Sequence, residues 1–229
     1  DRLRSRGLGD VYKRQQDNIK KVDKASNGKI GYIYIPDMGP EGLNEFSRYF
    51  YPQLDKEGLI IDDRANGGGN VSPMILERLS REPYRLTMRR GSARIGTVPD
   101  AVQVGPKVCL INKYSASDGD LFPWGFRALG LGKLIGTRTW GGIVGISGSL
   151  PYMDGTDIRV PFFTSFDPKT GSWIIENHGV DPDILIDNDP VKEWNGEDQQ
   201  LDRAIQEVMK ELQNRKPLPG VPTPRDFSK

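Results

Sequence analysis

The sequence predicts an α/β fold, and three observations support this prediction. Short apolar segments typical of buried strands alternate along the chain with segments of helical periodicity. Glycine and proline together occupy 44 positions, 27 and 17 respectively, so tight turns between these segments are frequent. Hydrophobic residues make up 36% of the 229 positions, which is enough for one hydrophobic core. In such folds the functional loops follow the carboxyl ends of the strands.

In the first half of the chain, strands and helices alternate. The segment KIGYIYI is rich in β-branched and aromatic residues and stops at Pro36, so it predicts a strand. Apolar residues from Leu43 to Leu54 recur with helical spacing, and the apolar run GLIID is followed by a glycine-rich turn. The expected elements are a helix at residues 16–24, strands at 29–35 and 58–62, and helices at 41–54 and 72–81.

The second half begins with the same pattern and then becomes mostly β. The run KVCLIN is a further buried strand, and the residues after it start as a turn and continue as a helix. After Trp140 the pattern is β, with turns at Asp154-Gly155 and at residues 167–171. The expected elements are strands at residues 107–112 and 134–137, a helix within 115–129 and an amphipathic helix at 201–212.

The two ends of the chain are expected to differ from the domain between them. Residues 1–15 are basic and lack the apolar core of a secretory signal. Their last six residues, DVYKRQ, are also what the end of a common sequencing-library transposon encodes in one frame. We therefore predict that residues 1–15 are a non-native sequencing artefact or, alternatively, a disordered arm. The domain is expected at residues 16–215, and residues 216–229 form a proline-rich tail.

The composition excludes several classes of function. Thirty-two basic and 31 acidic residues leave a net charge of +1, which argues against binding nucleic acid or an anionic membrane through net charge. No apolar run approaches the roughly 18 residues that span a bilayer, so no membrane insertion is expected. The single cysteine, Cys109, and the single histidine, His178, exclude an internal disulfide and metal centres built from several such residues. We expect no cofactor and no metal.

The first candidate for chemistry is the run Asn66-Gly67-Gly68-Gly69-Asn70, between a buried strand and a helix. Consecutive glycines let the backbone approach a ligand and point N–H groups at a developing negative charge. The alternative is a tight strand-to-helix turn with no further role. The run alone does not decide between the two.

The second candidate is Ser117, which also lies between a buried strand and a helix. Nucleophile elbows hold a serine in such a turn with its hydroxyl exposed, although the G-x-S-x-G pattern is absent. The alternative is an ordinary N-cap, which is the commonest role of a serine before a helix. The nearby Asp118 and Asp120 are expected to favour the helix dipole rather than to bind a metal.

The third candidate is the segment ENHGVDPD, which places His178 two residues after Glu176 and follows an apolar strand, WII. A triad of Ser117, His178 and a carboxylate is arithmetically possible. A lone histidine in a turn is more often a surface residue with satisfied hydrogen bonds. Both interpretations stay open from the residues alone.

Together these segments resemble a known family. The motifs GKIGYIYIPDM, GLIIDDRANGGGNVS, NKYSASDGDLF, LGLGKLIGTRTWGGIVGI and ENHGVDPDI occur in the order seen in the C-terminal catalytic domain of tricorn-type proteases. These are tail-specific (C-terminal-processing) serine peptidases. The resemblance covers roughly residues 29–212. It implies a crotonase-like α/β core of stacked ββα units and hydrolysis of peptides or unfolded proteins.

The resemblance assigns roles to residues that match the family motifs. Ser117, in the SDGD motif, is the expected nucleophile. The backbone N–H groups of Gly69 and Asp118 are the expected oxyanion hole. Glu176, in the EN-x-G motif, matches the distal catalytic carboxylate, which helps to orient a histidine–serine relay.

The match is incomplete at the general base. In tricorn-type members the base histidine lies in a segment before the PDZ domain, upstream of the residues present here. The serine–lysine branch of the family has its lysine where this chain has Gly141 and Gly142. His178 does not occupy the family's base position. The resemblance therefore implies a histidine-dependent enzyme whose fragment alone is poorly active or inactive.

The resemblance also implies partners, and two other functions compete with it. The complete protein is expected to carry upstream PDZ and β-propeller domains and to form a homo-oligomer. One alternative is a crotonase-like acyl-CoA enzyme, although the SDG and EN-x-G motifs argue against it. The other is a catalytically incompetent scaffold fragment. A single cysteine suits the cytoplasm and the bacterial cell envelope equally, so the sequence assigns no compartment.

Overall fold

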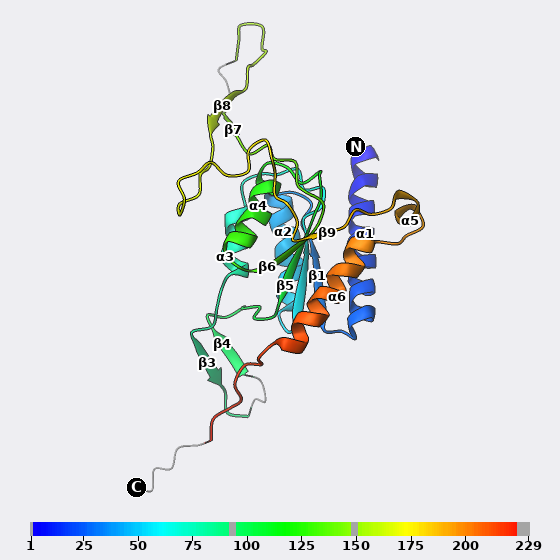
Figure 1. Cartoon of the computed structure of the whole chain (residues 1–229), viewed down its shortest axis with the longest axis vertical. Coiled ribbons are helices and arrows are strands. Elements are labelled where there is room, and N and C mark those ends of the chain that lie inside the picture. Colours follow the sequence, from blue (N-terminus) through cyan, green and yellow to red (C-terminus); the bar gives the residue numbers. More distant parts are fainter. Residues whose placement is uncertain (1, 92–94, 148–150, 224–229) are drawn as a thin grey trace.

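A parallel sheet forms the centre of the computed structural model, which describes residues 2–91, 95–147 and 151–223. The strand order is β1-β2-β5-β6-β9, and all neighbouring strands are parallel (Figure 1). Every residue of the first three of these strands is buried, as expected for a parallel sheet with both faces covered. The strands are β1 (Ile30–Tyr34), β2 (Gly58–Asp62), β5 (Lys107–Ile111), β6 (Gly132–Gly136) and β9 (Ile184–Leu185).

Helices cover both faces of the sheet and give three layers (Figure 1). On one face lie α2 (Pro40–Phe50), α3 (Ser72–Leu79) and α4 (Asp118–Ala128). On the other face lie α1 (Arg2–Ser26) and α6 (Gln199–Asn214). Each face has its own apolar core. The first includes Phe46, Ile61, Ile75, Phe122 and Phe126, and the second includes Tyr32, Ile60, Leu110, Leu201 and Val208.

Two antiparallel ribbons extend from the core at opposite ends of the molecule (Figure 1). One consists of β3 (Arg85–Met88) and β4 (Ile95–Val98), and the other of β7 (Gly145–Ser147) and β8 (Val160–Phe163). All four residues of β8 are exposed. The described residues also include the short helices η1 (Tyr51–Gln53) and α5 (Pro190–Trp194).

Most elements predicted from periodicity are confirmed, and the differences are local. The β3–β4 ribbon and α5 were not predicted, because none of their residues is buried and they have no buried apolar pattern. The strand predicted before Glu176 is wrong, since Trp173 forms only an isolated bridge with Phe166. Helix α1 continues through the boundary predicted at residue 16, and that boundary stays a prediction. Among the described residues, no helix is long and apolar enough to cross a membrane.

Candidate active site

The turn after β5 holds Ser117 in an unusual conformation. Its φ of 58° and ψ of −120° lie in a region that side chains rarely adopt, and the residue is exposed. Ser117 occupies the N-cap position of α4, yet its hydroxyl makes no capping hydrogen bond. The ordinary N-cap interpretation is therefore wrong. A strained turn that exposes the hydroxyl before a helix is the geometry of a nucleophile elbow.

The turn after β2 presents a free backbone N–H at Gly69. The Met38 N–H donates to the Gly68 oxygen at 2.9 Å, and the Asn70 N–H donates to the Met38 oxygen at 2.7 Å. In such a parallel bridge the N–H of the intervening residue points away from the partner strand. Within the described residues, the N–H groups of Gly69 and Asp118 have no hydrogen-bond partner. Both predicted oxyanion donors are therefore free.

These two turns are in direct contact, because β2 and β5 are neighbours in the sheet. The Ala116 N–H donates to the Asn66 oxygen at 2.8 Å. A Cβ added to Gly68 would lie 2.7 Å from the Ser117 Cβ and 3.0 Å from the Asp118 nitrogen. The glycine run thus brings its backbone against the serine turn, where a side chain at residue 68 would not fit.

Asn66 organises the glycine run, a role that the sequence pattern does not reveal. Its side-chain nitrogen donates to Asp63 Oδ1 at 2.9 Å and to the Ile35 oxygen at 3.2 Å. Its side-chain oxygen accepts the Gly68 N–H at 3.0 Å. Asp63 is fully buried, and its Oδ2 has no partner among the described residues. Burial, together with the charge of Asp62, raises the pKa of the Asp63 carboxyl well above its usual value.

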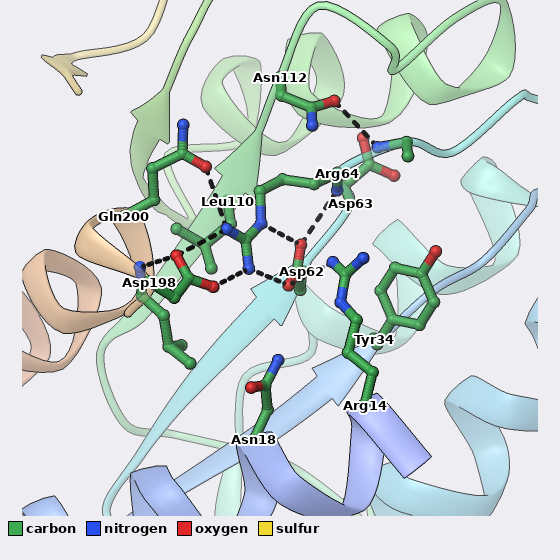
Figure 2. Close-up of polar contacts among 12 residues, drawn as sticks. Arg14, Asn18, Tyr34, Asp62, Asp63, Arg64, Leu110, Asn112, Asp198 and Gln200 are labelled. Carbon is green, nitrogen blue, oxygen red and sulfur yellow. Dashed lines mark hydrogen bonds and ion pairs between the residues drawn. The ribbon is translucent and has the colours of Figure 1, made fainter. Parts of the chain in front are cut away.

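Asp62 lies one residue earlier, on the opposite face of the sheet, in a buried ion-pair cluster. Figure 2 shows the Arg64 guanidinium between the carboxylates of Asp62 and Asp198. Arg64 donates to Asp62 at 2.6 Å and 2.9 Å, to Asp198 at 2.8 Å and 2.9 Å, and to Gln200 at 3.0 Å. Burial alone would raise the pKa of Asp62, but Arg64 lowers it to about 2. The cluster joins the end of β2 to the start of α6.

Asp118 and Asp120 lie in the first turn of α4, where acidic residues favour the helix dipole, and their carboxylates also hold neighbouring segments, a role that was not predicted. Asp118 accepts the Ser72 N–H at 2.9 Å and also the Ser72 hydroxyl, which connects α4 to the start of α3. Asp120 is fully buried and accepts N–H groups from Gly141 and Gly142. Burial raises the pKa of the Asp120 carboxyl, and hydrogen bonds from Thr139 and Gly141 oppose this shift.

Glu176 is half-buried and lies against the same segment as Asp120. Its Oε2 accepts the N–H groups of Ile143 at 2.7 Å and Val144 at 3.0 Å. Its Oε1 has no partner in the described part of the chain. One oxygen therefore fixes the side chain, while the other can accept a further hydrogen bond.

His178 lies on the surface and contacts neither Ser117 nor Glu176 through a hydrogen bond. Its Nε2 is 2.8 Å from Asp181 Oδ2, and its Nδ1 is 3.4 Å from the Arg138 guanidinium. The side chain is exposed. This arrangement is that of a surface histidine with satisfied hydrogen bonds, and it gives no support to an internal triad.

The site residues expected from the sequence do not line a cavity found elsewhere in the described part of the chain. That cavity, of about 800 Å³, lies between η1 and the β3–β4 ribbon, and its lining includes Tyr51, Arg89 and Asp100. Ser117, Gly69 and Glu176 are not among its lining residues. The candidate site is instead formed by loops at the carboxyl edge of the sheet.

Comparison with known proteins identifies a peptidase family. Residues 29–186 match the family model described as Peptidase family S41. Tricorn protease of Thermoplasma volcanium is 45% identical over 204 residues, which cover 88% of this chain and 19% of that protein. Tricorn protease homolog 1 of Streptomyces coelicolor is 38% identical over 189 residues, covering 82% of this chain and 18% of that protein. The chain thus spans about a fifth of the length of these curated relatives.

Solved structures agree with the sequence comparison. The crystal structure of the tricorn protease matches with a TM-score of 0.82 and 43% identity over 87% of this chain and 19% of that chain. The photosystem II D1 C-terminal processing protease matches with a TM-score of 0.53 and 22% identity over 69% of this chain and 42% of that chain, which shows the fold alone. These matches confirm the predicted crotonase-like α/β fold class, and they do not favour the acyl-CoA alternative.

Proposed function

Because this chain belongs to peptidase family S41, we propose that it is the catalytic domain of a serine peptidase that cleaves peptides or unfolded proteins, with Ser117 as nucleophile. The observation that carries this proposal is the strained, exposed Ser117 beside two free backbone N–H groups. Backbone donors already fixed in place stabilise the negative charge of a tetrahedral intermediate without reorganising during the reaction.

The proposed reaction proceeds through an acyl-enzyme. The Ser117 hydroxyl oxygen attacks the peptide carbonyl carbon while a general base takes its proton, and the carbonyl oxygen becomes an oxyanion. The N–H groups of Gly69 and Asp118 stabilise this oxyanion. The protonated base then gives its proton to the leaving amine, and the C–N bond breaks. Water, activated by the same base, hydrolyses the ester and restores the serine.

We assign the general base to a histidine outside this chain and the carboxylate role to Glu176. His178 is the only histidine present, and its ring is occupied by Asp181 and Arg138. The free Oε1 of Glu176 suits a carboxylate that accepts a hydrogen bond from the segment that brings the base. The 229 residues alone are then poorly active or inactive.

The partners follow from the same proposal. The curated relatives are about five times as long as the matched segment, which supports a complete protein with further domains. The expected ones are upstream PDZ and β-propeller domains, and the complete protein is expected to form a homo-oligomer. The domain limits at residues 16 and 215 belong to this proposal as well.

A serine-directed fluorophosphonate probe tests the assignment. In the complete protein we expect the probe to label Ser117 and to stop peptide hydrolysis in proportion to labelling. The isolated chain should react much more slowly, because it lacks the base that activates the hydroxyl. Inhibition with the label on another serine, or equally fast labelling of the isolated chain, would contradict the proposal.

A further inference from the structure

Four consecutive backbone N–H groups, from residues 141 to 144, donate to two carboxylates. The first two bind Asp120: Gly141 to Oδ1 at 2.7 Å and Gly142 to Oδ2 at 3.3 Å. The next two bind Glu176 Oε2, at 2.7 Å and 3.0 Å. A short loop is therefore held at one end by a carboxylate from α4 and at the other by the proposed catalytic carboxylate.

Asp120 belongs to the helix that carries the nucleophile turn. It lies three residues after Ser117, in the first turn of α4, and its own N–H donates to the Ser117 oxygen at 2.8 Å. An aspartate in the first turn of a helix usually favours the exposed helix dipole. Asp120 is instead fully buried, and both its oxygens accept N–H groups of a segment about twenty residues further along the chain.

The hydrogen bonds form a closed ring that includes Glu176. Besides binding Asp120, Gly141 accepts the Asn177 N–H with its oxygen at 2.7 Å. Asn177 directly follows Glu176, whose carboxylate returns to the same loop. The ring therefore runs from Gly141 along the loop to Glu176 and back through Asn177 to Gly141, and Asp120 binds it from outside at Gly141 and Gly142. A second bond, from the Trp140 N–H to the Ser115 oxygen at 2.9 Å, joins the loop to the nucleophile turn.

We propose that Asp120 is a positioning residue that holds Glu176 in place relative to Ser117 through the loop of residues 141–144. This inference rests on the proposed role of Glu176. A carboxylate is needed because two N–H groups converge on the two oxygens of Asp120. An asparagine offers one acceptor and places an NH₂ group against the other donor, so the loop has to move and Glu176 moves with it.

The test is a double-mutant cycle in the complete protein, with Asp120→Asn, Glu176→Gln and their combination. We expect Asp120→Asn to lower kcat by about 10- to 100-fold, the usual effect of losing the partner that orients a catalytic group, while KM changes by less than about threefold. The combined variant should be no more than about threefold slower than Glu176→Gln, because Asp120 acts through Glu176.

Asp183→Asn is the matched control. Asp183 also accepts a backbone N–H from a distant segment, that of Leu134 at 2.7 Å, but it has no bond to the loop of residues 141–144. The kcat of the Asp183→Asn variant should stay unchanged even if the thermal stability of the variant falls. Because a buried substitution can unfold the domain, rates are counted per folded molecule. Asp120→Ser, which keeps one oxygen acceptor in a smaller volume, serves as a second variant and should show the same lack of additivity.

Each outcome of the cycle either supports or overturns the positioning role of Asp120. Losses that multiply in the combined variant, or an unchanged kcat in both Asp120 variants, overturn the positioning role while leaving Glu176 catalytic. An unchanged kcat in Glu176→Gln overturns the proposed role of Glu176 and this inference with it. The inference is supported if Asp120→Asn lowers kcat, the combined variant is hardly slower than Glu176→Gln, and Asp183→Asn keeps its kcat.

Discussion

Two parts of the candidate site are built in different ways. The nucleophile part consists of residues 63–71 and 112–120, which directly follow the neighbouring buried strands β2 and β5. The carboxylate part consists of residues 138–144 and 174–180, and the exposed β7–β8 ribbon lies between these segments in the sequence. The first part follows directly from two paired strands, whereas the second is held by carboxylates that accept N–H groups of residues 141–144. The strands therefore position the nucleophile turn, whereas side chains must hold the segments around Glu176.

The two parts also use different chemical groups. The nucleophile part offers the Ser117 hydroxyl and the N–H groups of Gly69 and Asp118, whose positions depend on backbone turns. The carboxylate part depends on two carboxylates, its own Glu176 and Asp120 at the end of the nucleophile part, which together accept four N–H groups. A substitution should therefore act through backbone geometry in the first part and through lost acceptors in the second.

The largest effect is expected for Ser117→Ala in the complete protein, which should lower kcat by about 10⁴-fold or more. The hydroxyl makes no capping bond, so the unfolding free energy should change little. Ser117→Gly should be equally inactive but more stable than Ser117→Ala by about 1 kcal/mol, because glycine adopts a positive φ without strain. Peptide hydrolysis and denaturant unfolding measure the two effects. Retained turnover in Ser117→Ala contradicts the nucleophile assignment.

The next largest effect is expected for Glu176→Gln, whose kcat is compared with that of His178→Gln. Glu176→Gln should lower kcat by about 10²- to 10⁴-fold, since an uncharged amide orients and stabilises an imidazolium poorly. His178→Gln should leave kcat within about threefold, because an exposed pair such as that of His178 with Asp181 contributes little. Steady-state kinetics of both variants in the complete protein provide the measurement. The reverse pattern, with only His178→Gln inactive, indicates an internal triad.

Gly69→Ala is expected to have a smaller effect, confined to the nucleophile part. The new Cβ would lie 2.0 Å from the Met38 oxygen, and φ is +152°, so the N–H of residue 69 must turn or shift. We expect kcat to fall by about 10²-fold, the scale of losing one oxyanion donor. Gly67→Ala is the control, because nothing lies within 4 Å of its added Cβ. Equal kcat values for the two variants would place the oxyanion hole elsewhere.

The nucleophile part could be predicted from the sequence for a physical reason. Buried parallel strands are short apolar runs, and the turns after them meet at one edge of the sheet. The runs GLIID and KVCLIN therefore predict that the glycine run and Ser117 lie at one sheet edge, and the structure pairs Asp62 with Leu110. The strain at Ser117 was not predicted, because a φ of 58° leaves no trace in residue type when the residue is not glycine.

The carboxylate part could not be predicted in the same way. The role of Glu176 as the distal carboxylate came only from the family resemblance, since its two N–H donors at residues 143 and 144 lie more than thirty positions away. Asp120 was expected to favour the helix dipole, because the first turn of a helix is where such aspartates are common. The same holds for one residue of the nucleophile part, since the pattern of the glycine run does not show that the Asn66 amide holds Asp63 and Gly68. Contacts between distant segments leave no periodic signal.

The smallest expected effect is on the pH dependence of stability. It concerns Asp62 and Asp63, two adjacent buried carboxyls where β2 ends and the nucleophile part begins. The pKa of Asp62 is lowered from 3.8 to about 2, so its ionised form stabilises the fold above pH 3.8, and this contribution is lost as pH falls toward 2. The loss amounts to about 2 kcal/mol of unfolding free energy. The pKa of Asp63 is raised, so its ionised form costs stability, and protonation relieves this cost as pH falls toward 3.8.

The two shifts thus act in separate pH ranges and with opposite signs, and denaturant unfolding of the chain at several pH values distinguishes them. Asp62→Asn should make the loss of unfolding free energy below about pH 4 less steep, because residue 62 no longer carries a titrating carboxyl beside Arg64. Asp63→Asn should leave that acid loss intact and remove the gain that protonation gives above about pH 4. If the unfolding free energy falls equally steeply with acid in Asp62→Asn and in the wild type, the pair of Asp62 with Arg64 does not stabilise the end of β2 that leads into the nucleophile part. The strand ends and the hydrogen bonds of Asn66 must then hold that part.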